Sequence, residues 1–260
     1  MTRAGYYAWW SRAESERRKQ DRELLKVIGS IFEASRGTYG SPRVHRELVR
    51  IGLVVSRRRV ERLMRLAGLR GRVVRIYRSN PKLHRFFEQH PNRLWRSSAQ
   101  AADRVWVADI TYLPVAGHWR YLAVVMDQYS RRVLGWSLGR ERDARLPRAA
   151  FDHAFRLRRP TRGLIFHSDR GSEYSASLLR DRLRALGIQQ SMGRSGTPAD
   201  NAHMESFFHS FKADVVHGLN IQDDDQLRAL VSGYVRYYNH KRLHSSLGFL
   251  SPVEFECRVA

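Results

Sequence analysis

The spacing of apolar residues changes at Val105, and this change most constrains what the chain can fold into. Residues 105–115, 119–127 and 132–138 are three successive β-rich segments with short connections, which predicts an antiparallel meander. A helix through 146–154, a strand at 164–167, a helix at 175–186 and a strand at 188–192 follow. Strands in a run, then strands alternating with helices, predict an α/β fold with a mixed five-stranded sheet flanked by helices.

The segment before this change is predicted to be all-helical. A first helix is expected over 21–34, a second opens with Ser41 as N-cap and Pro42 at its first position, and a third runs from the N-cap Ser56 to Gly68. Two helices joined by a short Gly-containing turn, with arginines on the second, are typical of a helix-turn-helix DNA reader. The alternative is a small three-helix bundle with a solvated basic face. The arginines expected to contact DNA are Arg57, Arg58, Arg59, Arg62 and Arg65.

The charge of the chain favours a polyanionic partner. Its 47 Lys and Arg side chains against 25 Asp and Glu give a net charge of +22, too large for a neutral background. Basic residues are concentrated in the first 100 positions, and residues 70–103 read as a basic linker, either a phosphate-tracking arm or a solvated connector. Codon bias is an alternative explanation for the excess of arginine over lysine, although it does not explain the net charge.

Three carboxylates stand where a metal site could form. Asp109 interrupts an apolar strand, Asp169 follows directly after the short strand ending at Ser168, and Glu205 lies on a helix expected to begin at the N-cap Thr197. Carboxylate oxygens are suitable ligands for Mg²⁺, and two ions about 4 Å apart can assist in-line phosphoryl transfer. The separation of Asp169 and Glu205 would not be persuasive by itself, because some acidic pair at that distance is expected by chance.

Five stretches decide between these interpretations. Over almost its whole length the chain resembles the integrase-type transposases of bacterial insertion sequences, and most closely the second-reading-frame product of the insertion sequence three family, a relative of retroviral integrases. The matching stretches, in the order of the family, are residues 38–45 (TYGSPRVH), 106–112 (WVADITY), 167–172 (HSDRGS), 200–208 (DNAHMESFF) and 238–244 (YNHKRLH).

The resemblance implies an RNase H-like core in which Asp109, Asp169 and Glu205 are catalytic metal ligands. It also implies two Mg²⁺ ions, or Mn²⁺, and cleavage of element ends followed by attack of the freed 3′-OH on another phosphodiester. A first-frame protein, or a frameshifted fusion with it, is the implied partner, with homo-oligomers forming on double-stranded DNA. One departure is Glu173, where the family motif leads us to expect an amide; it could alter metal affinity or be inert.

Other polar and aromatic residues receive weaker interpretations. Residues expected to contact DNA beyond the front helices are Asn201, His209, Lys212, Lys241 and Arg242. A metal pair of His240 and His244 is less favoured than phosphate contact or packing. Asp127, at the end of a strand, could be a fourth metal ligand, but a turn-capping role is favoured. Tyr234, Tyr237, Tyr238 and Trp136 could stack on flipped bases, but aromatics at such spacing are more often core.

These expectations divide the chain into five parts: an N-terminal basic and aromatic segment (1–20), the helix-turn-helix domain (21–69), the linker (70–103), the catalytic core (104–220), and a C-terminal helix and tail packed on the core (221–260). With no apolar run of about 18 residues, no membrane partner is expected, and the location is expected to be the bacterial cytoplasm, at the nucleoid. The rival functions are a structure-selective nuclease of the same fold and a transposase-derived DNA-binding regulator.

Overall fold

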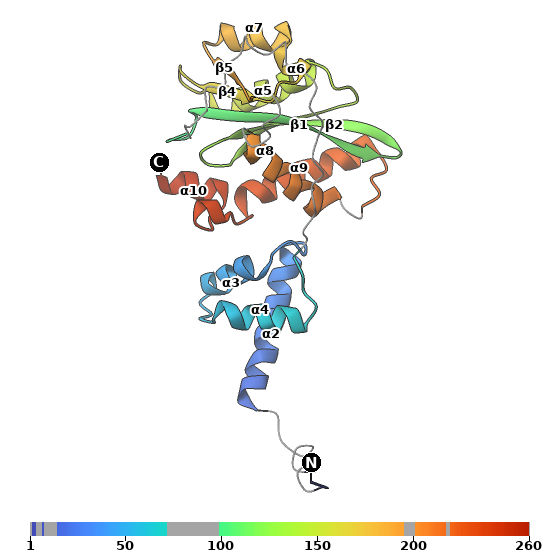
Figure 1. Cartoon of the computed structure of the whole chain (residues 1–260), viewed down its shortest axis with the longest axis vertical. Helices are drawn as coiled ribbons and strands as arrows, with labels where there is room; N and C mark the ends of the chain where they lie inside the picture. The colour runs from blue at the N-terminus through green and yellow to red at the C-terminus, as the bar shows by residue number, and fades with distance from the viewer. Residues whose placement is uncertain are drawn as a thin grey trace. The chain divides into compact units, whose positions relative to one another are not determined.

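The computed structural model describes residues 15–71, 99–194, 201–216 and 219–259, together with Thr2, Arg3 and Tyr7. The chain divides into two compact units, residues 1–73 and 74–260 (Figure 1). No helix in these described ranges is both long and apolar enough to cross a membrane.

The first unit is built on three helices, α2 (Glu16–Ala34), α3 (Ser41–Arg50) and α4 (Arg57–Leu66). Helix α2 begins earlier than predicted because Ser15 caps it, accepting a hydrogen bond from the Arg18 N–H. Ser56 caps α4 as predicted. The prediction for Ser41 was wrong: Gly40 is the N-cap of α3 and Ser41 is its first helical residue. The helices share a core of Leu24, Ile28, Val44, Leu48, Val60, Leu63 and Met64.

The second unit is built on a mixed five-stranded sheet, as predicted. Strands β1 (Val105–Val115), β2 (His118–Asp127) and β3 (Val133–Gly139) form the antiparallel meander. Strands β4 (Ile165–Ser168) and β5 (Gln189–Met192) pair in parallel, and β4 also pairs in parallel with β1. The strand order β3-β2-β1-β4-β5 therefore puts β1 at the centre of the sheet.

Helices cover both faces of this sheet (Figure 1). Helix α5 (Arg145–Arg158) lies on one face with α6 (Ser172–Ser175) and α7 (Ser177–Ala185). The helix predicted at 175–186 is α7, which begins at Ser177 because Ala176 has extended backbone, and the short helix α6 before it was not predicted. The other face carries α8 (Ala202–Phe211), the π-helical turn η2 (Lys212–Val216) and α9 (Asp224–His240), followed by the short turn η3 (Ser245–Leu247) and α10 (Pro252–Val259).

The apolar stripe predicted on α8 is core. Met204, Phe207 and Phe211 are fully buried against β1, β2 and α9. Tyr234 and Tyr238 of α9 belong to the same core, so their interpretation as core residues is confirmed. The predicted cap Thr197 lies outside the described residues, and the described part of α8 follows Asn201.

Candidate functional site

Asp109 and Asp169 are brought together by backbone pairing. Strand β1 runs parallel to β4, with Ala108 opposite Ser168, so that the next residue of each chain segment is one of the two aspartates. Both stand where β4 ends and β1 continues alone on that side. This is the edge of the sheet at which α/β proteins usually place their sites.

Each of the two carboxylates is hard to ionise, because burial and a neighbouring negative charge, Asp169 for Asp109 and Glu173 for Asp169, raise its pKa. Burial, and next the charge of Asp169, raise the pKa of Asp109 to about 8, although the Ile110 N–H donates a hydrogen bond of 2.7 Å to Asp109 Oδ1. Burial also raises the pKa of Asp169, against a hydrogen bond of 3.1 Å from the Gly171 N–H. A divalent cation would relieve this repulsion, and carboxylate oxygens are the ligands that Mg²⁺ prefers. The pair therefore fits the metal that the sequence implied.

Glu205 approaches from helix α8. Asn201, at the start of that helix, donates a hydrogen bond of 3.1 Å from Nδ2 to the Ala108 carbonyl, next to Asp109 in the chain. Glu205 lies one turn further on, exposed, and its charge raises the pKa of Asp109 less than burial and Asp169 do. Within the described ranges no three His, Cys, Asp or Glu side chains lie close enough to hold a metal ion. Asp109 and Asp169 are therefore neighbours, and Glu205 does not form a three-carboxylate cluster with them.

Glu173, the residue whose role the sequence left open, is buried and bound to arginine. Its carboxylate accepts a short hydrogen bond from Arg142 Nε and another of 3.2 Å from Ser172 Oγ. The carboxylate folds over Gly171, where an added Cβ would lie 2.8 Å from Glu173 Oε1. Because the Gly171 N–H also binds Asp169, the Glu173 carboxylate belongs to the surroundings of the site.

Two neighbours of the site were missed by sequence reasoning. Arg142 lies in the loop before α5, and its positive charge lowers the pKa of both Asp109 and Asp169. The Tyr174 hydroxyl is fully buried and has no hydrogen-bond partner in the described part of the chain. Burial, and then the charges of Asp109 and Asp169, raise the pKa of Tyr174. Nothing in the local sequence around Arg142 points to its role, because its partner is 31 residues away.

Lys212 is the basic residue of the α8 side that lies nearest to this chemistry. Its Nζ is 4.5 Å from the centroid of the Tyr112 ring, and it is half-buried. Burial lowers the pKa of Lys212, and the nearby Asp109 charge raises it. His209 is half-buried on the same helix, whereas the Asn201 amide, expected to face DNA, is buried and bound to Ala108.

The arginines of α4 fall into two groups. Arg57 and Arg58 are exposed at the start of the helix. Arg59 and Arg62 bind Asp21 of α2 at 2.7 and 2.6 Å, and Arg65 binds Glu61 at 3.1 Å. Arg57 and Arg58 are thus directed to solvent, while Arg59 and Arg62 link α4 to α2.

The C-terminal basic motif divides in the same way. Lys241 is exposed, whereas the Arg242 guanidinium is buried and binds Asp214 at 3.3 Å and Ser210 at 3.0 Å. In this arrangement Arg242 ties the segment after α9 to the end of α8, and it is not exposed to a DNA backbone. His244 packs edge to face on Tyr238, beyond the end of α9 at His240, so the two histidines do not share one helix.

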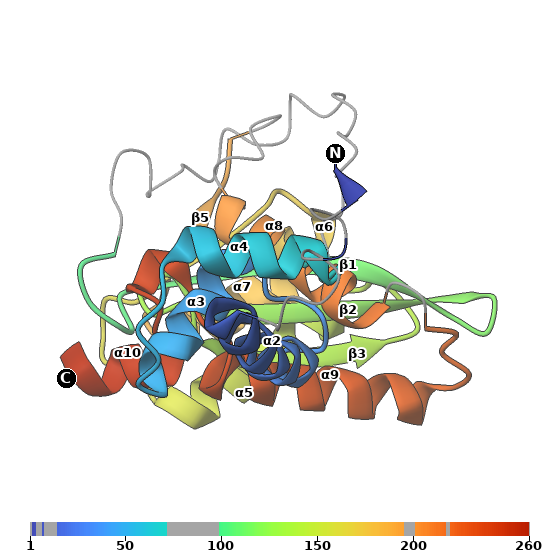
Figure 2. The ribbon, with the colours of Figure 1, turned by 90° about the horizontal axis from the view of Figure 1, so that it is seen from below.

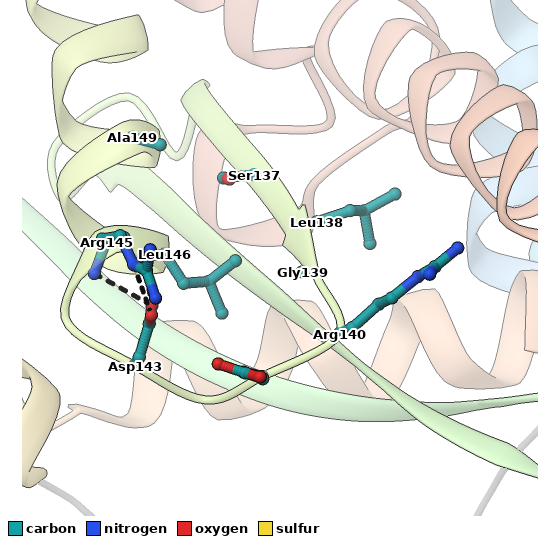
Figure 3. Close-up of a pocket in the computed structure, with 9 residues that line it drawn as sticks. Ser137, Leu138, Gly139, Arg140, Asp143, Arg145, Leu146 and Ala149 are labelled. Atoms are coloured by element: carbon teal, nitrogen blue, oxygen red, sulfur yellow. Dashed lines mark hydrogen bonds and ion pairs between the residues drawn. The ribbon is translucent and has the colours of Figure 1, made fainter.

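Two further features complete the surroundings of the sheet. Asp127 caps a turn as predicted, since its Oδ1 accepts hydrogen bonds from the N–H groups of Tyr129 and Ser130. A cavity of about 430 Å³ lies where β3 leads into α5, with Arg140 and Arg145 at its wall (Figure 3). Arg145 binds Asp143 there at 2.7 Å, and none of the three candidate carboxylates lines the cavity.

Comparison with known proteins agrees with this geometry. Models of the integrase core domain match residues 99–198 and 186–252, and a model of an HTH-like domain matches residues 19–77. The chain is 35% identical over 239 residues to the transposase for insertion sequence element IS904 of Lactococcus lactis subsp. lactis (strain IL1403), covering 91% of this chain and 94% of that protein. It is 34% identical over 266 residues to the transposase InsF for insertion sequence IS3A of Escherichia coli (strain K12), covering 98% and 90%.

A solved structure shares the fold. The chain matches one in the cryoEM structure of the simian T-cell lymphotropic virus intasome in complex with PP2A regulatory subunit B56 gamma, with a TM-score of 0.50 and 13% identity, over 88% of this chain and 74% of that one. The sheet is therefore the RNase H-like sheet of integrase catalytic cores, as expected.

Proposed function

The chain belongs to the IS3 family of insertion-sequence transposases, which carry an integrase core, and from that premise we propose that Asp109, Asp169 and Glu205 hold the metal ions with which it cuts and joins DNA. The observation that carries this proposal is the parallel register of β1 and β4, which sets Asp109 beside Asp169 in a buried place. The hydrogen bond from Asn201 to Ala108 supports the addition of Glu205, because it ties the start of α8 to the same strand.

We propose Mg²⁺, with Mn²⁺ as a substitute, in two sites formed by these three carboxylates. When bound, such ions activate the attacking oxygen and stabilise the leaving oxygen of a phosphodiester. The protein contributes the positions of the ligands. Asp109 lies on β1 and Asp169 directly follows its paired neighbour β4, so the sheet holds both in place, whereas Glu205 completes the set from an exposed face of α8.

The surrounding cations would guide the DNA. Lys212 is held at Tyr112 close to Asp109, in reach of a phosphate that occupies the site. In the first unit, the exposed Arg57 and Arg58 are the residues we expect to bind the element end, with Arg59, Arg62 and Arg65 behind them on the same helix. Lys241 is a further candidate contact, and Arg242 acts through packing.

We further propose that the protein works as an oligomer on DNA with a first-frame protein or as a fusion to it, at the nucleoid. The 47 basic side chains are many more than one phosphate at the site would need, which supports binding to a longer stretch of nucleic acid.

The test is a joining assay with labelled element ends and Mg²⁺, with and without the first-frame protein. Glu205→Gln is expected to lower joining at least about 1,000-fold and to leave DNA affinity within twofold, because it removes a metal ligand and no basic residue. Asp225→Asn, at an exposed position in the first turn of α9, is the matched control and should join normally. Cleavage without joining by the wild-type protein would favour a nuclease, and binding without either reaction would favour a regulator.

A further inference from the structure

Two large aromatic side chains lie together on the outside of the β1–β2 hairpin. Tyr112 is 57% exposed and Trp119 is 55% exposed. Their ring centroids are 5.0 Å apart with an interplanar angle of 88°, so the rings meet edge to face, with the edge of one ring against one face of the other. Among the described residues from 99 onward, no other aromatic side chain is exposed to this degree.

The hairpin itself explains why these rings reach solvent. Strand β4 pairs with β1 only as far as Ala108, so the second half of β1 is paired with β2 alone. Both views show this hairpin extending beyond the other strands (Figures 1 and 2). Leu113 and Val115 on one face are buried in the core beneath α8 and α9, and Tyr112 alternates with them on the opposite face. Two rings at such an exposed place are not needed for the core.

A cation and the candidate site adjoin this pair. The Lys212 Nζ lies 4.5 Å from the Tyr112 ring centroid, which gives the aromatic surface a positive charge. Tyr112 follows Asp109 by three residues on an extended strand, which is a rise of about 10 Å and puts the two side chains on opposite faces of β1. Lys212 connects them, because its Nζ lies over the Tyr112 ring and the charge of Asp109 raises its pKa. A DNA strand whose phosphate is at the carboxylates would reach the rings by passing Lys212.

We propose that Tyr112 and Trp119, together with Lys212, form an aromatic platform that stacks unpaired bases of the DNA strand next to the reacting phosphate. Exposed aromatic faces beside a cation match a ligand that carries flat π-systems on a charged backbone, and unpaired nucleotides have both. Bases within a duplex are stacked on both faces by their neighbours, so the platform selects DNA that is frayed or single-stranded beside the site. This inference rests on the proposed function and adds the form of the DNA that the site takes.

The test compares two duplexes, one blunt and one with a short single-stranded flank that contains 2-aminopurine, bound to the full-length protein without divalent metal. We expect the wild-type protein to prefer the flanked duplex by about tenfold, because stacking of one base contributes about 1–3 kcal/mol. The fluorescence of 2-aminopurine should fall on binding. The double variant Tyr112→Ala/Trp119→Ala should lose both the preference and the quenching, whereas Tyr112→Phe/Trp119→Phe should keep both.

Leu157→Ala provides the matched control, since Leu157 is an apolar side chain of α5 with 52% exposure. It should leave the preference unchanged. If the double alanine variant keeps the wild-type preference, the platform is excluded. If that variant instead loses affinity for the first-frame protein and still prefers the flank, the rings are a protein-docking surface and the inference is wrong. Joining by the wild-type protein with Mg²⁺, measured in parallel, separates these outcomes from failure of the proposed function.

Discussion

The candidate site has a strand side, Asp109 and Asp169, and a helix side, Glu205. The two sides are positioned by different kinds of interaction. Asp109 and Asp169 occupy adjacent positions on two strands whose register is set by backbone hydrogen bonds. Glu205 depends on the placement of a whole helix, which packs through Met204, Phe207 and Phe211 and contacts β1 beside the site through the Asn201 amide. The strand side therefore exists before any ligand binds, and the helix side is adjustable.

This difference indicates how the site would close. The negative charge of Asp169 contributes to the raised pKa of Asp109. A cation bound at the two aspartates would offset this repulsion. Glu205 is exposed, and no three-carboxylate cluster forms within the described residues, so a shift of α8 would be needed for Glu205 to join the aspartates. Metal and DNA together would then favour the closed position by binding it more tightly than the open one.

Among the variants that keep all three carboxylates, the largest expected effect comes from removing the link between the two sides. Asn201→Ala removes the hydrogen bond to the Ala108 carbonyl, so α8 loses its attachment next to Asp109. We expect joining per folded molecule to fall about 100-fold, since misplacing a catalytic group by about 1 Å can have that effect. The free energy of unfolding should fall by only about 1 kcal/mol. Both quantities are measured on the same preparation, by the joining assay and by urea unfolding.

Asn239→Ala is the matched control for this prediction. Asn239 is also a buried asparagine bound to the backbone of the sheet, through two hydrogen bonds of 2.9 Å with Val133. Its loss should lower stability at least as much as the loss of Asn201 and leave joining per folded molecule near the wild-type rate. Equal activity losses in the two variants would mean that Asn201 acts through general stability, and the comparison between the two sides would fail.

The next effect is a pH dependence that belongs to the strand side alone. The pKa of Asp109 is about 8 in the folded protein and near 3.8 when unfolded, so between these values the folded state keeps a proton that the unfolded state has released. The stability of the metal-free protein should therefore fall as pH rises from about 4 to 8. Asp109→Asn should remove most of this slope and stabilise the metal-free protein at pH 8 by about 2 kcal/mol, after allowance for water at the half-buried carboxylate.

Thermal unfolding in EDTA across that pH range measures this effect. Glu205→Gln is the comparison variant, and it should leave the slope nearly unchanged because Glu205 contributes less to the Asp109 pKa than burial and Asp169 do. A slope that disappears in Glu205→Gln and persists in Asp109→Asn would reverse the assignment of the two sides.

The same division decides how much of the molecule is predictable from sequence. Strands are local patterns, so the meander, the mixed sheet, and the positions of Asp109 within β1 and Asp169 after β4 follow from periodicity and motif. The turn cap Asp127 and the helix cap Ser56 were also predicted correctly from the sequence. Contacts between distant segments could not be predicted in this way. The partner of Glu173 is Arg142, that of Arg242 is Asp214, and that of Arg59 is Asp21, and in each case only the tertiary structure reveals whether an arginine is exposed or already paired.

The smallest expected effect tests whether the Arg142–Glu173 ion pair sets the charge of the strand side. Glu173→Gln removes a negative charge beside Asp169 and leaves the Arg142 charge unopposed, so Mn²⁺ binding in the absence of DNA should weaken about fivefold. Arg142→Gln should tighten it, and the double variant should return close to wild type. Calorimetric titration with Mn²⁺ gives these affinities. Asp152→Asn, which breaks the ion pairs of this α5 residue with Arg148 of α5 and Arg182 of α7, is the control and should have no effect. If the strand side is preformed, Glu205→Gln should change the affinity for Mn²⁺ in the absence of DNA less than Glu173→Gln does. A larger change would mean that Glu205 already binds the metal ion before DNA is present. If the double variant binds Mn²⁺ as weakly as Glu173→Gln alone, the ion pair acts through packing, because restoring the balance of charge would not have restored the affinity.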